Sequence, residues 1–492
     1  MDYAQYRKYD AVGLASLVAA GDVTAEELLE AAIERCEAVN RPLNAVTTPM
    51  YGIAGRRARE ELSGALAGVP FLIKDLMQDY KGLPTGSGSK ALRHVRATAH
   101  STVVQRWLDA GLVIFGKTNT PEFGLKGITE PQAGGVTRNP WNLSHTAGGS
   151  SGGAAAAVAA GIVPVAGASD GGGSIRIPAA CCGVFGLKPG RGVVSCGPHH
   201  AEYLHGAATE GVISRTVRDS AVMLDVLTAK PDMGGPYLVA RPDLSYATLA
   251  ERDPGRLRIG YSTRSPLETD VHAEAVAAVS DAAALLAHLG HEVEPAEPAI
   301  DGRQLASDFI VMWCTQVAVT VDEVQKQTGA SADDFELDTQ ALAAVGRAVS
   351  ATEYYSAHER WNSYSRQLGA FHEKYDVLLT PTIARPPVRI GQLDTPPVLN
   401  ALLRPVLRLG IADKFASTSV WKNTVLANLA TVPFTQLANI TGRPAMSVPT
   451  YRTAAGLPLG VQFVGGLASE GLLLSLANQI ETERPWAHLE PV

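Results

Sequence analysis

The sequence predicts an α/β fold, in which helices pack on a β-sheet that lies in the core. Two short apolar runs, residues 69–73 and 112–115, have the length and composition of buried strands. Between them, residues 101–110 show the spacing of an amphipathic helix and are followed by Gly111, a common helix terminator. This alternation of strand, helix and strand is typical of α/β domains that carry functional loops at the sheet edge.

The N-terminal region is predicted to be mainly helical. Residues 11–39 have the pattern of two short helices, and the second begins with a capping box formed by Thr24 and Glu27. We expect a strand to begin within residues 43–46. The charged residues 55–62 are predicted to form a surface helix.

The same alternation returns in the second half of the chain. Residues 300–425 are mostly helical in pattern and are predicted to form a cap or an insertion. The last two predicted strands pair with each other, and a helix closes the chain. In order, the expected elements are a strand at 257–261, a helix at 271–289, and strands at 291–295, 376–382, 442–449 and 457–464, followed by a helix at 470–483.

Composition limits the classes of protein that fit. A chain of 492 residues that is 46% hydrophobic can bury a large core. Its net charge of −7 gives no electrostatic reason to bind nucleic acid or an anionic membrane. Residues 154–168 form the most apolar run, but Gly161 and Pro164 interrupt it and it is too short to span a bilayer. The first residues lack an apolar signal segment, so we expect a soluble cytoplasmic protein without a membrane partner.

The cysteines and histidines favour neither a disulfide framework nor a metal site. The five cysteines are odd in number and contain no Cys-x-x-Cys pair. The twelve histidines are scattered and lack ligand spacing. We therefore expect no metal and no cofactor.

The most informative stretch runs from residue 148 to residue 176. It contains two glycine-rich loops, Gly-Gly-Ser-Ser-Gly-Gly around Ser150 and Gly-Gly-Gly-Ser around Ser174. Either loop alone could be a flexible linker or a phosphate cradle, but the first lacks the Gly-Lys-Ser/Thr ending of a P-loop. The pair is more specific, because consecutive N–H groups in such a turn can hold an oxyanion beside a serine.

A lysine completes this constellation. Lys74 ends the buried strand predicted at 69–73, and burial lowers the pKa of a lysine so that its neutral amine can act as a base. No histidine lies in any of these loops. The residues therefore predict a relay in which Lys74 takes a proton from Ser174 through Ser150. The N–H groups of residues 171–174, which are Gly171, Gly172, Gly173 and Ser174, would stabilise the oxyanion.

These motifs resemble the amidase signature family. The resemblance rests on the two serine loops, the 24-residue step between Ser150 and Ser174, and the upstream Ile-Lys-Asp. It extends through Gly-Lys-Thr-Asn-Thr-Pro-Glu, Arg-Asn-Pro-Trp, Gly-Leu-Lys-Pro, Thr-Gly-Arg-Pro-Ala and Leu-Pro-Leu-Gly-Val-Gln. It implies a single large domain over residues 1–492, with a central mixed sheet flanked by helices on both faces. The core is expected at about 60–230 and 430–485, and the less regular helical cap at about 300–425.

The family's functional residues can be carried over position by position. Ser174 matches the nucleophile, and Lys74 matches the base. Ser150 matches a bridging serine that the family holds on a cis peptide bond, here Gly149–Ser150. The resemblance implies supporting roles for three more residues. Ser151 would be a hydrogen-bonding neighbour of Ser150, and Asp170 and Arg176 would brace the oxyanion loop.

Within the family, the Thr-Asn-Thr-Pro-Glu and Thr-Arg-Asn-Pro-Trp-Asn-Leu segments resemble those of 6-aminohexanoate-cyclic-dimer hydrolases, which open nylon-related cyclic amides. Cys314 falls roughly where that subgroup has a substrate-contacting cysteine, although a buried cysteine on an apolar helix is usually a core residue. Family members commonly have a bulkier residue at the position of Gly171. A glycine there would make the loop more mobile or leave more room for the acyl group.

The expected function is cleavage of carbon–nitrogen amide bonds through a serine acyl-enzyme, without a cofactor. The substrate would be a small-molecule amide or carbamate, including cyclic or linear nylon-type oligoamides. Hydrolysis of urethanes, aryl acylamides or esters on the same triad is the alternative. The glutaminase subunit of a tRNA-dependent amidotransferase fits less well, and so does a binding protein without catalysis. A homodimer is a family expectation.

Overall fold

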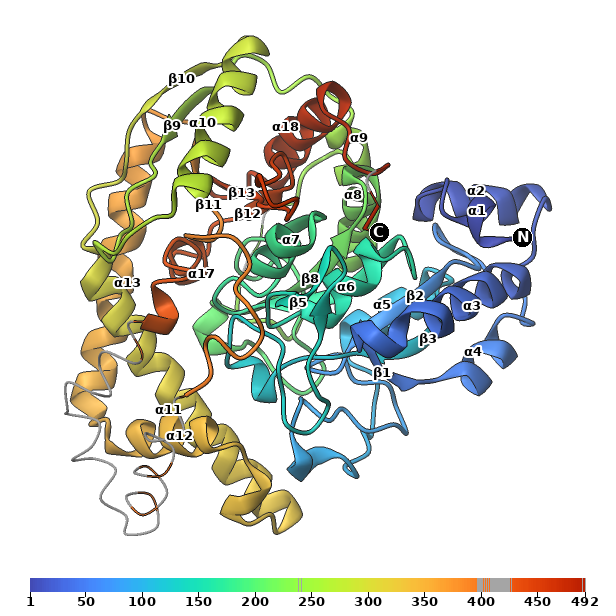
Figure 1. The fold of residues 1–492 in the computed structure, drawn as a ribbon, viewed down its shortest axis with the longest axis horizontal. Helices are drawn as coiled ribbons and strands as arrows, with labels where there is room; N and C mark the ends of the chain where they lie inside the picture. The colour runs from blue at the N-terminus through green and yellow to red at the C-terminus, as the bar shows by residue number, and fades with distance from the viewer. Residues whose placement is uncertain are drawn as a thin grey trace.

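The computed structural model describes residues 1–237, 239, 241–395, 401, 403, 405, 407, 425, 427–488, 490 and 491. Within them, one mixed sheet has eleven strands in the order β1-β3-β2-β6-β8-β7-β12-β13-β11-β9-β10 (Figure 1). The strands of this sheet are β1 (Val46–Pro49), β2 (Pro70–Lys74), β3 (Val113–Thr118), β6 (Val165–Asp170), β7 (Phe185–Lys188), β8 (Thr209–Ser214), β9 (Arg258–Tyr261), β10 (Glu292–Pro295), β11 (Val377–Pro381), β12 (Ala445–Val448) and β13 (Val461–Gly465). A separate pair joins β4 (Arg138–Asn139) to β5 (Asn142–Thr146).

Helices surround this sheet and join its strands. The α-helices in the described part of the chain are α1 (Tyr3–Tyr6), α2 (Ala11–Ala20), α3 (Ala25–Leu43), α4 (Tyr51–Arg57), α5 (Thr102–Asp109), α6 (Gly152–Ala159), α7 (Arg176–Cys182), α8 (Val217–Thr228), α9 (Tyr246–Ala250), α10 (Ala273–His288), α11 (Gly302–Thr328), α12 (Leu337–Ala348), α13 (Ala351–His372), α17 (Gln436–Ile440) and α18 (Glu470–Glu483). The predicted α/β class, with a central mixed sheet, is confirmed.

The two faces of the sheet carry different helices. Gly167 of β6 and Leu187 of β7 both pair with Val212 of β8, so they lie in one row and share a face. A Cβ on Gly167 would meet Trp107 of α5. Gly186 is adjacent to Leu187 in β7 and therefore points to the opposite face, where its Cβ would meet Ala179 of α7. Helix α5 therefore lies on one face and α7 on the other.

The central strands are completely buried because the sheet is covered on both sides. Strands β2, β3, β6, β7 and β8 have only buried residues. Near-continuous apolar runs with little alternation are what such a sheet requires. Lys74, the last residue of β2, is consequently held in the core, although the charged end of a lysine side chain normally reaches solvent.

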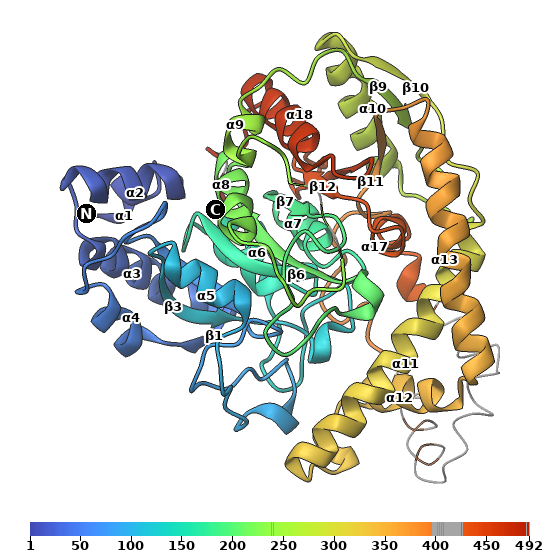
Figure 2. The same cartoon turned by 180° about the vertical axis from the view of Figure 1, so that it is seen from behind.

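The helices α11, α12 and α13 form a layer beside one end of the sheet, opposite the N-terminal helices (Figures 1 and 2). By length and hydropathy, α11 is the one described helix that could cross a membrane. In the fold it packs against α12 and α13 and buries Phe309, Met312 and Val317. This is the arrangement of a core helix in a folded domain.

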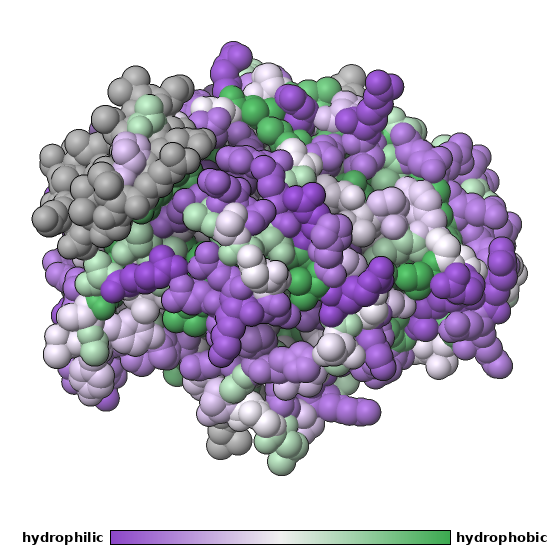
Figure 3. Space-filling view, turned by 90° about the horizontal axis from the view of Figure 1, so that it is seen from below, coloured by the Kyte–Doolittle hydropathy of each residue, from purple (hydrophilic) through white to green (hydrophobic). Residues whose placement is uncertain are grey.

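The exposed surface is mixed in character. In the view of Figure 3, hydrophilic residues predominate and apolar residues lie in small separate patches. The large apolar side chains that are exposed come from distant parts of the chain, and include Leu143, Met233, Tyr355 and Leu467. The homodimer expected from the resemblance stays a prediction.

The strand expected to begin within residues 43–46 is β1, which begins at Val46 because α3 runs through Pro42 to Leu43 and ends at Asn44 in the left-handed conformation. The position of the helix expected at 55–62 was wrong, because this helix is α4, which spans Tyr51–Arg57. It buries Ala54 and contacts β3, whereas the charged residues after Ala58 offer no apolar face to pack. The capping box at Thr24 is present.

Substitution of Phe463 by alanine tests the location of the core. Phe463 is fully buried in β13, where it pairs with Met446 of β12 and Leu379 of β11. The loss of its ring should lower the free energy of unfolding by about 3–5 kcal/mol, because a cavity remains. Leu467→Ala is the matched control, since this side chain is 70% exposed and its loss should change stability by less than about 0.5 kcal/mol. Urea unfolding measures both, and equal stabilities would contradict this core.

Candidate active site

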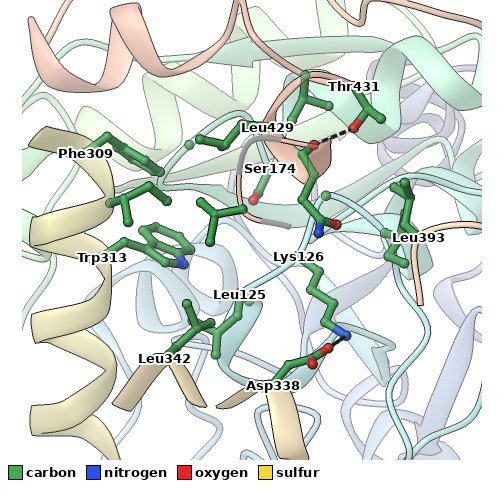
Figure 4. Close-up of a pocket in the computed structure, with 18 of the residues that line it drawn as sticks. Leu125, Lys126, Ser174, Phe309, Trp313, Asp338, Leu342, Leu393, Leu429 and Thr431 are labelled. Atoms are coloured by element: carbon green, nitrogen blue, oxygen red, sulfur yellow. Dashed lines mark hydrogen bonds and ion pairs between the residues drawn. The ribbon is translucent and has the colours of Figure 1, made fainter. Parts of the chain in front are cut away.

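A cavity with a volume of about 160 Å³ lies between the sheet and the helical layer. Ser174 and Gly172 border it from the second glycine loop, and Phe309 and Trp313 border it from α11 (Figure 4). Most of its other lining side chains are apolar, including Leu125, Ile177 and Leu342. Cavities of this kind, with a few polar groups in an apolar wall, are typical of small-molecule sites.

Lys74 does not line this cavity and is shielded from solvent. Its side chain is fully buried at the end of β2, and Nζ donates hydrogen bonds to Ser150 Oγ at 2.8 Å and to Ser169 Oγ at 3.0 Å. Burial lowers the pKa of Lys74 to about 7, although the negative charges of Glu210 and Asp170 oppose this effect. A large fraction of Lys74 is therefore a neutral amine near pH 7.

The glycines beside Ser150 fit the loop closely against its neighbours. The Gly149–Ser150 peptide bond is cis. A Cβ on Gly149 would lie 2.6 Å from the carbonyl oxygen of Ile128, and one on Gly153 would lie 2.4 Å from the backbone nitrogen of Asn119. Only glycine allows such close approach of two backbone segments. The sequence pattern therefore places the Ser150 hydroxyl against Lys74.

Ser174 is positioned at the cavity wall, with 8% of its surface exposed. Its carbonyl oxygen accepts a hydrogen bond from the Ser151 N–H at 3.2 Å. The hydroxyl of Ser151 in turn exchanges hydrogen bonds with the backbone of Ser169 in β6. The described contacts do not include a bond between the Ser150 and Ser174 hydroxyls. Lys74 and Ser150 are thus in direct contact, and Ser174 is joined to them through the backbone of Ser151.

Asp170 and Arg176 brace the second glycine loop from inside. Both are fully buried, and two guanidinium nitrogens of Arg176 donate to the two oxygens of Asp170 at 2.9 Å each. Burial by itself would raise the pKa of Asp170, but the charge and hydrogen bonds of Arg176 hold it well below its usual range. The carboxylate also accepts the N–H groups of Gly173 at 2.7 Å and Ile175 at 3.1 Å.

This bracing corrects one part of the predicted oxyanion hole. The N–H of Gly173 points to Asp170 and is not available to a ligand. The N–H groups of Gly171, Gly172 and Ser174 donate to none of the described residues. Three of the four predicted donors are therefore open to accept an oxyanion, and the fourth fixes the shape of the loop.

Cys314 does not lie where the sequence resemblance suggested. Its side chain is fully buried on α11, and it is not among the described residues that line the cavity. Its carbonyl lies against Gly346 of α12, and burial raises the pKa of the thiol to about 12. Phe309 and Trp313, four residues apart on the same helix face, border the cavity instead. The expected substrate contact by Cys314 is not supported by this geometry.

Two groups of polar residues near the site were not found from the sequence. Lys126 and Asp338 form an ion pair at one side of the cavity, away from Ser174 (Figure 4). Glu210 of β8 is fully buried and accepts a hydrogen bond from Gln78 Nε2 at 2.7 Å. A charged residue close to the apolar pair Val212 and Ile213 was the available signal for Glu210. Asp338 had no such signal, because its segment lacks a recognisable motif.

A metal site is not indicated. Among the described residues, no group of three or more histidine, cysteine, aspartate or glutamate side chains could hold a metal ion. The polar groups around Ser174 are instead hydroxyls and backbone N–H groups, with the buried amine of Lys74 bonded to Ser150, and such groups serve nucleophilic and oxyanion chemistry.

The fold and this site define a class of protein. The sequence pattern of the amidase family matches residues 27–474, so the chain belongs to the amidase (amidase signature) family. Members are hydrolases that act on carbon–nitrogen amide bonds, and the chain is an amidohydrolase.

Individual members of the family are similar to this chain over nearly its whole length. The 6-aminohexanoate-cyclic-dimer hydrolases of Pseudomonas sp. (strain NK87) and Paenarthrobacter ureafaciens are each 38% identical to this chain, covering 98% of it and 96% of their own length. A solved structure of a 6-aminohexanoate cyclic dimer hydrolase superposes with a TM-score of 0.88 at 36% identity, covering 98% of both chains. A bacterial aryl acylamidase superposes with a TM-score of 0.83 at 28% identity, covering 97% of both chains.

Alanine substitutions in the second glycine loop test whether its shape matters. At Gly173, φ is +129° and a Cβ would lie 2.6 Å from Ile177 and Thr435, so Gly173→Ala should distort the loop and lower kcat/KM at least about 100-fold. At Gly171, a Cβ would meet Ala208 and Leu204 at 3.4 Å, an ordinary contact, so Gly171→Ala should stay within about threefold of wild type. Amide hydrolysis by folded protein measures both, and similar losses would contradict the assigned geometry.

Proposed function

We propose that this protein hydrolyses amide bonds through an acyl-enzyme, with Ser174 as the nucleophile, Ser150 as the proton bridge and Lys74 as the base. One observation carries the proposal: a fully buried lysine with a lowered pKa donates to Ser150 Oγ at 2.8 Å, and Ser150 lies against Gly124, which lines the same cavity as Ser174. A serine needs such a base before it can attack an amide. A neutral lysine can fill this role without a histidine.

Acylation can be written with these groups alone. Ser174 Oγ attacks the amide carbon while its proton passes to Ser150 Oγ and the proton of Ser150 passes to Lys74 Nζ. The new bond between Oγ and carbon sends the π electrons of the carbonyl onto its oxygen. When the carbon–nitrogen bond breaks, the leaving nitrogen takes the proton back from Lys74 through Ser150.

The negative charge on oxygen requires nearby donors. The N–H groups of Gly171, Gly172 and Ser174, which have no partner among the described residues, are suited to this role. A single lost donor of this kind typically costs about 3–4 kcal/mol of transition-state stabilisation. Asp170, Arg176 and Ser151 would support the loop from behind rather than contact the substrate.

Deacylation repeats the same chemistry with water. A water molecule gives a proton to Lys74 through Ser150 and attacks the acyl carbon, and Ser174 regains its proton as the ester bond breaks. The net products are a carboxylic acid and an amine. No cofactor is needed to balance the reaction, and the partner is a small-molecule substrate.

The cavity favours an apolar substrate with an amide bond at Ser174. Aliphatic side chains such as Leu125 and Leu342 line much of it, and one ion pair, Lys126–Asp338, provides a polar edge. Together with the relatives named above, this favours cyclic or linear nylon-type oligoamides, in which polymethylene segments alternate with amides.

A second candidate substrate class has its own support. Phe309 and Trp313 stack at a centroid distance of 5.1 Å and border the cavity, so an aryl group could pack on them. This favours aryl acylamides, and the same triad would also act on urethanes and esters. The glutaminase function has no comparable support, because glutamine is polar and the lining is mostly apolar. Cytoplasmic location and a homodimer stay predictions.

A substrate panel with wild type and Ser174→Ala tests the proposal. The panel contains a cyclic amide dimer, a linear aliphatic amide, an anilide, a carbamate, an ester and glutamine. Ser174→Ala should lose at least about 10⁴-fold in kcat on every substrate that wild type hydrolyses, because the nucleophile is gone. A folded Ser174→Ala protein with full activity would disprove the mechanism. Turnover of the cyclic dimer would favour oligoamides, and turnover of the anilide or carbamate alone would favour the second class.

The pH dependence should report the state of Lys74. The base is active only when neutral, and burial lowers its pKa to about 7, so kcat/KM for an amide should rise with pH up to about 7 and then level off. Below pH 7 each unit should cost about tenfold. Initial rates from pH 5 to 9 measure this. Lys74→Met should lose the acid limb in its residual ester hydrolysis, and a flat wild-type profile would contradict Lys74 as the base.

A further inference from the structure

A buried carboxyl group lies beside Lys74 and is not used in the mechanism above. Glu210 is 2% exposed in the middle of the sheet, where an unpaired charge is costly. It belongs to β8, and its register partner in β6 is Ser169, the residue whose hydroxyl accepts a hydrogen bond from Lys74. Directly paired residues in antiparallel strands have side chains on the same face, about 5 Å apart. Ser169 therefore lies between the two groups, since it accepts a hydrogen bond from Lys74 and is the register partner of Glu210.

Gln78 links Lys74 and Glu210 by hydrogen bonds. Its Oε1 accepts the backbone N–H of Lys74 at 2.6 Å, and its Nε2 donates to Glu210 Oε2 at 2.7 Å. The other carboxyl oxygen, Glu210 Oε1, is buried and has no hydrogen-bond partner among the described residues. A carboxyl group that is half satisfied in the core is expensive unless it compensates another charge.

We propose that Glu210 is a positioning residue for the reaction, which stabilises the protonated form of Lys74 during the transfer of the serine proton. The inference rests on the proposed function of Lys74 as the base. Lys74 becomes a buried cation when it accepts the proton that Ser150 passes on, and Glu210 is the carboxylate that can balance this charge across Ser169. It does not touch the substrate.

The charged state of the pair supports this role. Burial lowers the pKa of Lys74 and raises the pKa of Glu210, while the charge of each group opposes this effect of burial on the other. The titrations of the two groups are therefore coupled. Without the carboxylate, burial would lower the pKa of Lys74 further and make it a weaker base.

Other polar groups face the pair but do not replace Glu210. Asp170 is the second carboxylate that acts on Lys74, and Arg176 already neutralises it. Asp79 faces Glu210 and favours its protonated form. Cys196 and Tyr203 also lie within electrostatic reach of Glu210, and burial raises the pKa of the Cys196 thiol to about 12 and that of Tyr203 still higher, so both stay neutral.

Glu210→Gln is the sharpest test, because the amide keeps an oxygen that can accept from Gln78 and removes only the charge. The acid limb of kcat/KM for an amide should move to lower pH by about one unit or more, since an opposite charge no longer supports protonated Lys74. The plateau rate should fall, because a weaker base takes the proton less readily. Modification of Ser174 by a fluorophosphonate across the same pH range gives a readout independent of the leaving amine.

Glu481→Gln is the matched control. Glu481 on α18 also has a carboxyl pKa raised to about 7 by burial, but it accepts the N–H of Val217 and faces Asp10 and Arg218 rather than Lys74. This variant should leave the acid limb unchanged. If Glu210→Gln does not fold, Glu210→Asp withdraws the charge by one methylene group, and its acid limb should move in the same direction by a smaller amount.

The outcomes separate this inference from the proposed function. A folded Glu210→Gln protein, or failing that Glu210→Asp, with an unmoved acid limb in both assays would overturn the role of Glu210 while Ser174→Ala remains inactive. A shift shared by Glu481→Gln would also overturn it, because the effect would then be one of general stability. An active Ser174→Ala protein would instead disprove the mechanism itself.

Discussion

The exclusion of water from Lys74 is the constraint on which the rest of the site depends. A lysine ammonium in bulk water has a pKa far above neutrality and cannot accept a proton from a serine at neutral pH. Strand β2 lies between β3 and β6, with helices over both faces of the sheet, so its last side chain is fully buried. Desolvation then produces the neutral amine. The proposed role of Lys74 therefore depends on a sheet large enough to bury the end of β2.

A second buried charge fixes the loop that carries Ser174. Besides Asp170, the guanidinium of Arg176 contacts Gln462 Oε1 and Asn439 Oδ1 at 2.6 Å each and the carbonyl of Thr435 at 2.9 Å. A buried ion pair is tolerable only when its remaining donors and acceptors are satisfied in this way. Residues from α17 and β13, more than 250 positions away, thus hold the glycine loop in place.

The groups of the proposed relay and the cavity come from different parts of the fold. Lys74 and the serines belong to the sheet and its loops, whereas α11 and α12 supply Trp313, Leu342 and Asp338. The segment that follows β3 joins the two parts: Glu122 accepts the N–H of Glu336 at 2.8 Å, and Lys126 pairs with Asp338. Changes in the helical layer can therefore alter substrate choice without disturbing the proton relay.

The sequence by itself determined the fold class and most strands and helices, and it pointed to the three residues of the proposed relay. Periodicity and glycine spacing are local properties, and they indicated β2, α5, β13 and α18 and the two serine loops directly. Only the tertiary structure decided that Gly173 donates to Asp170 and that Trp313 lines the cavity while the backbone carbonyl of Cys314 lies against α12. It also placed Glu210 across the sheet from Lys74, 136 positions away in the chain. Such contacts depend on strand register and on the rotation of helices about their axes. Packing between distant segments sets both, so neither can be predicted from the local sequence.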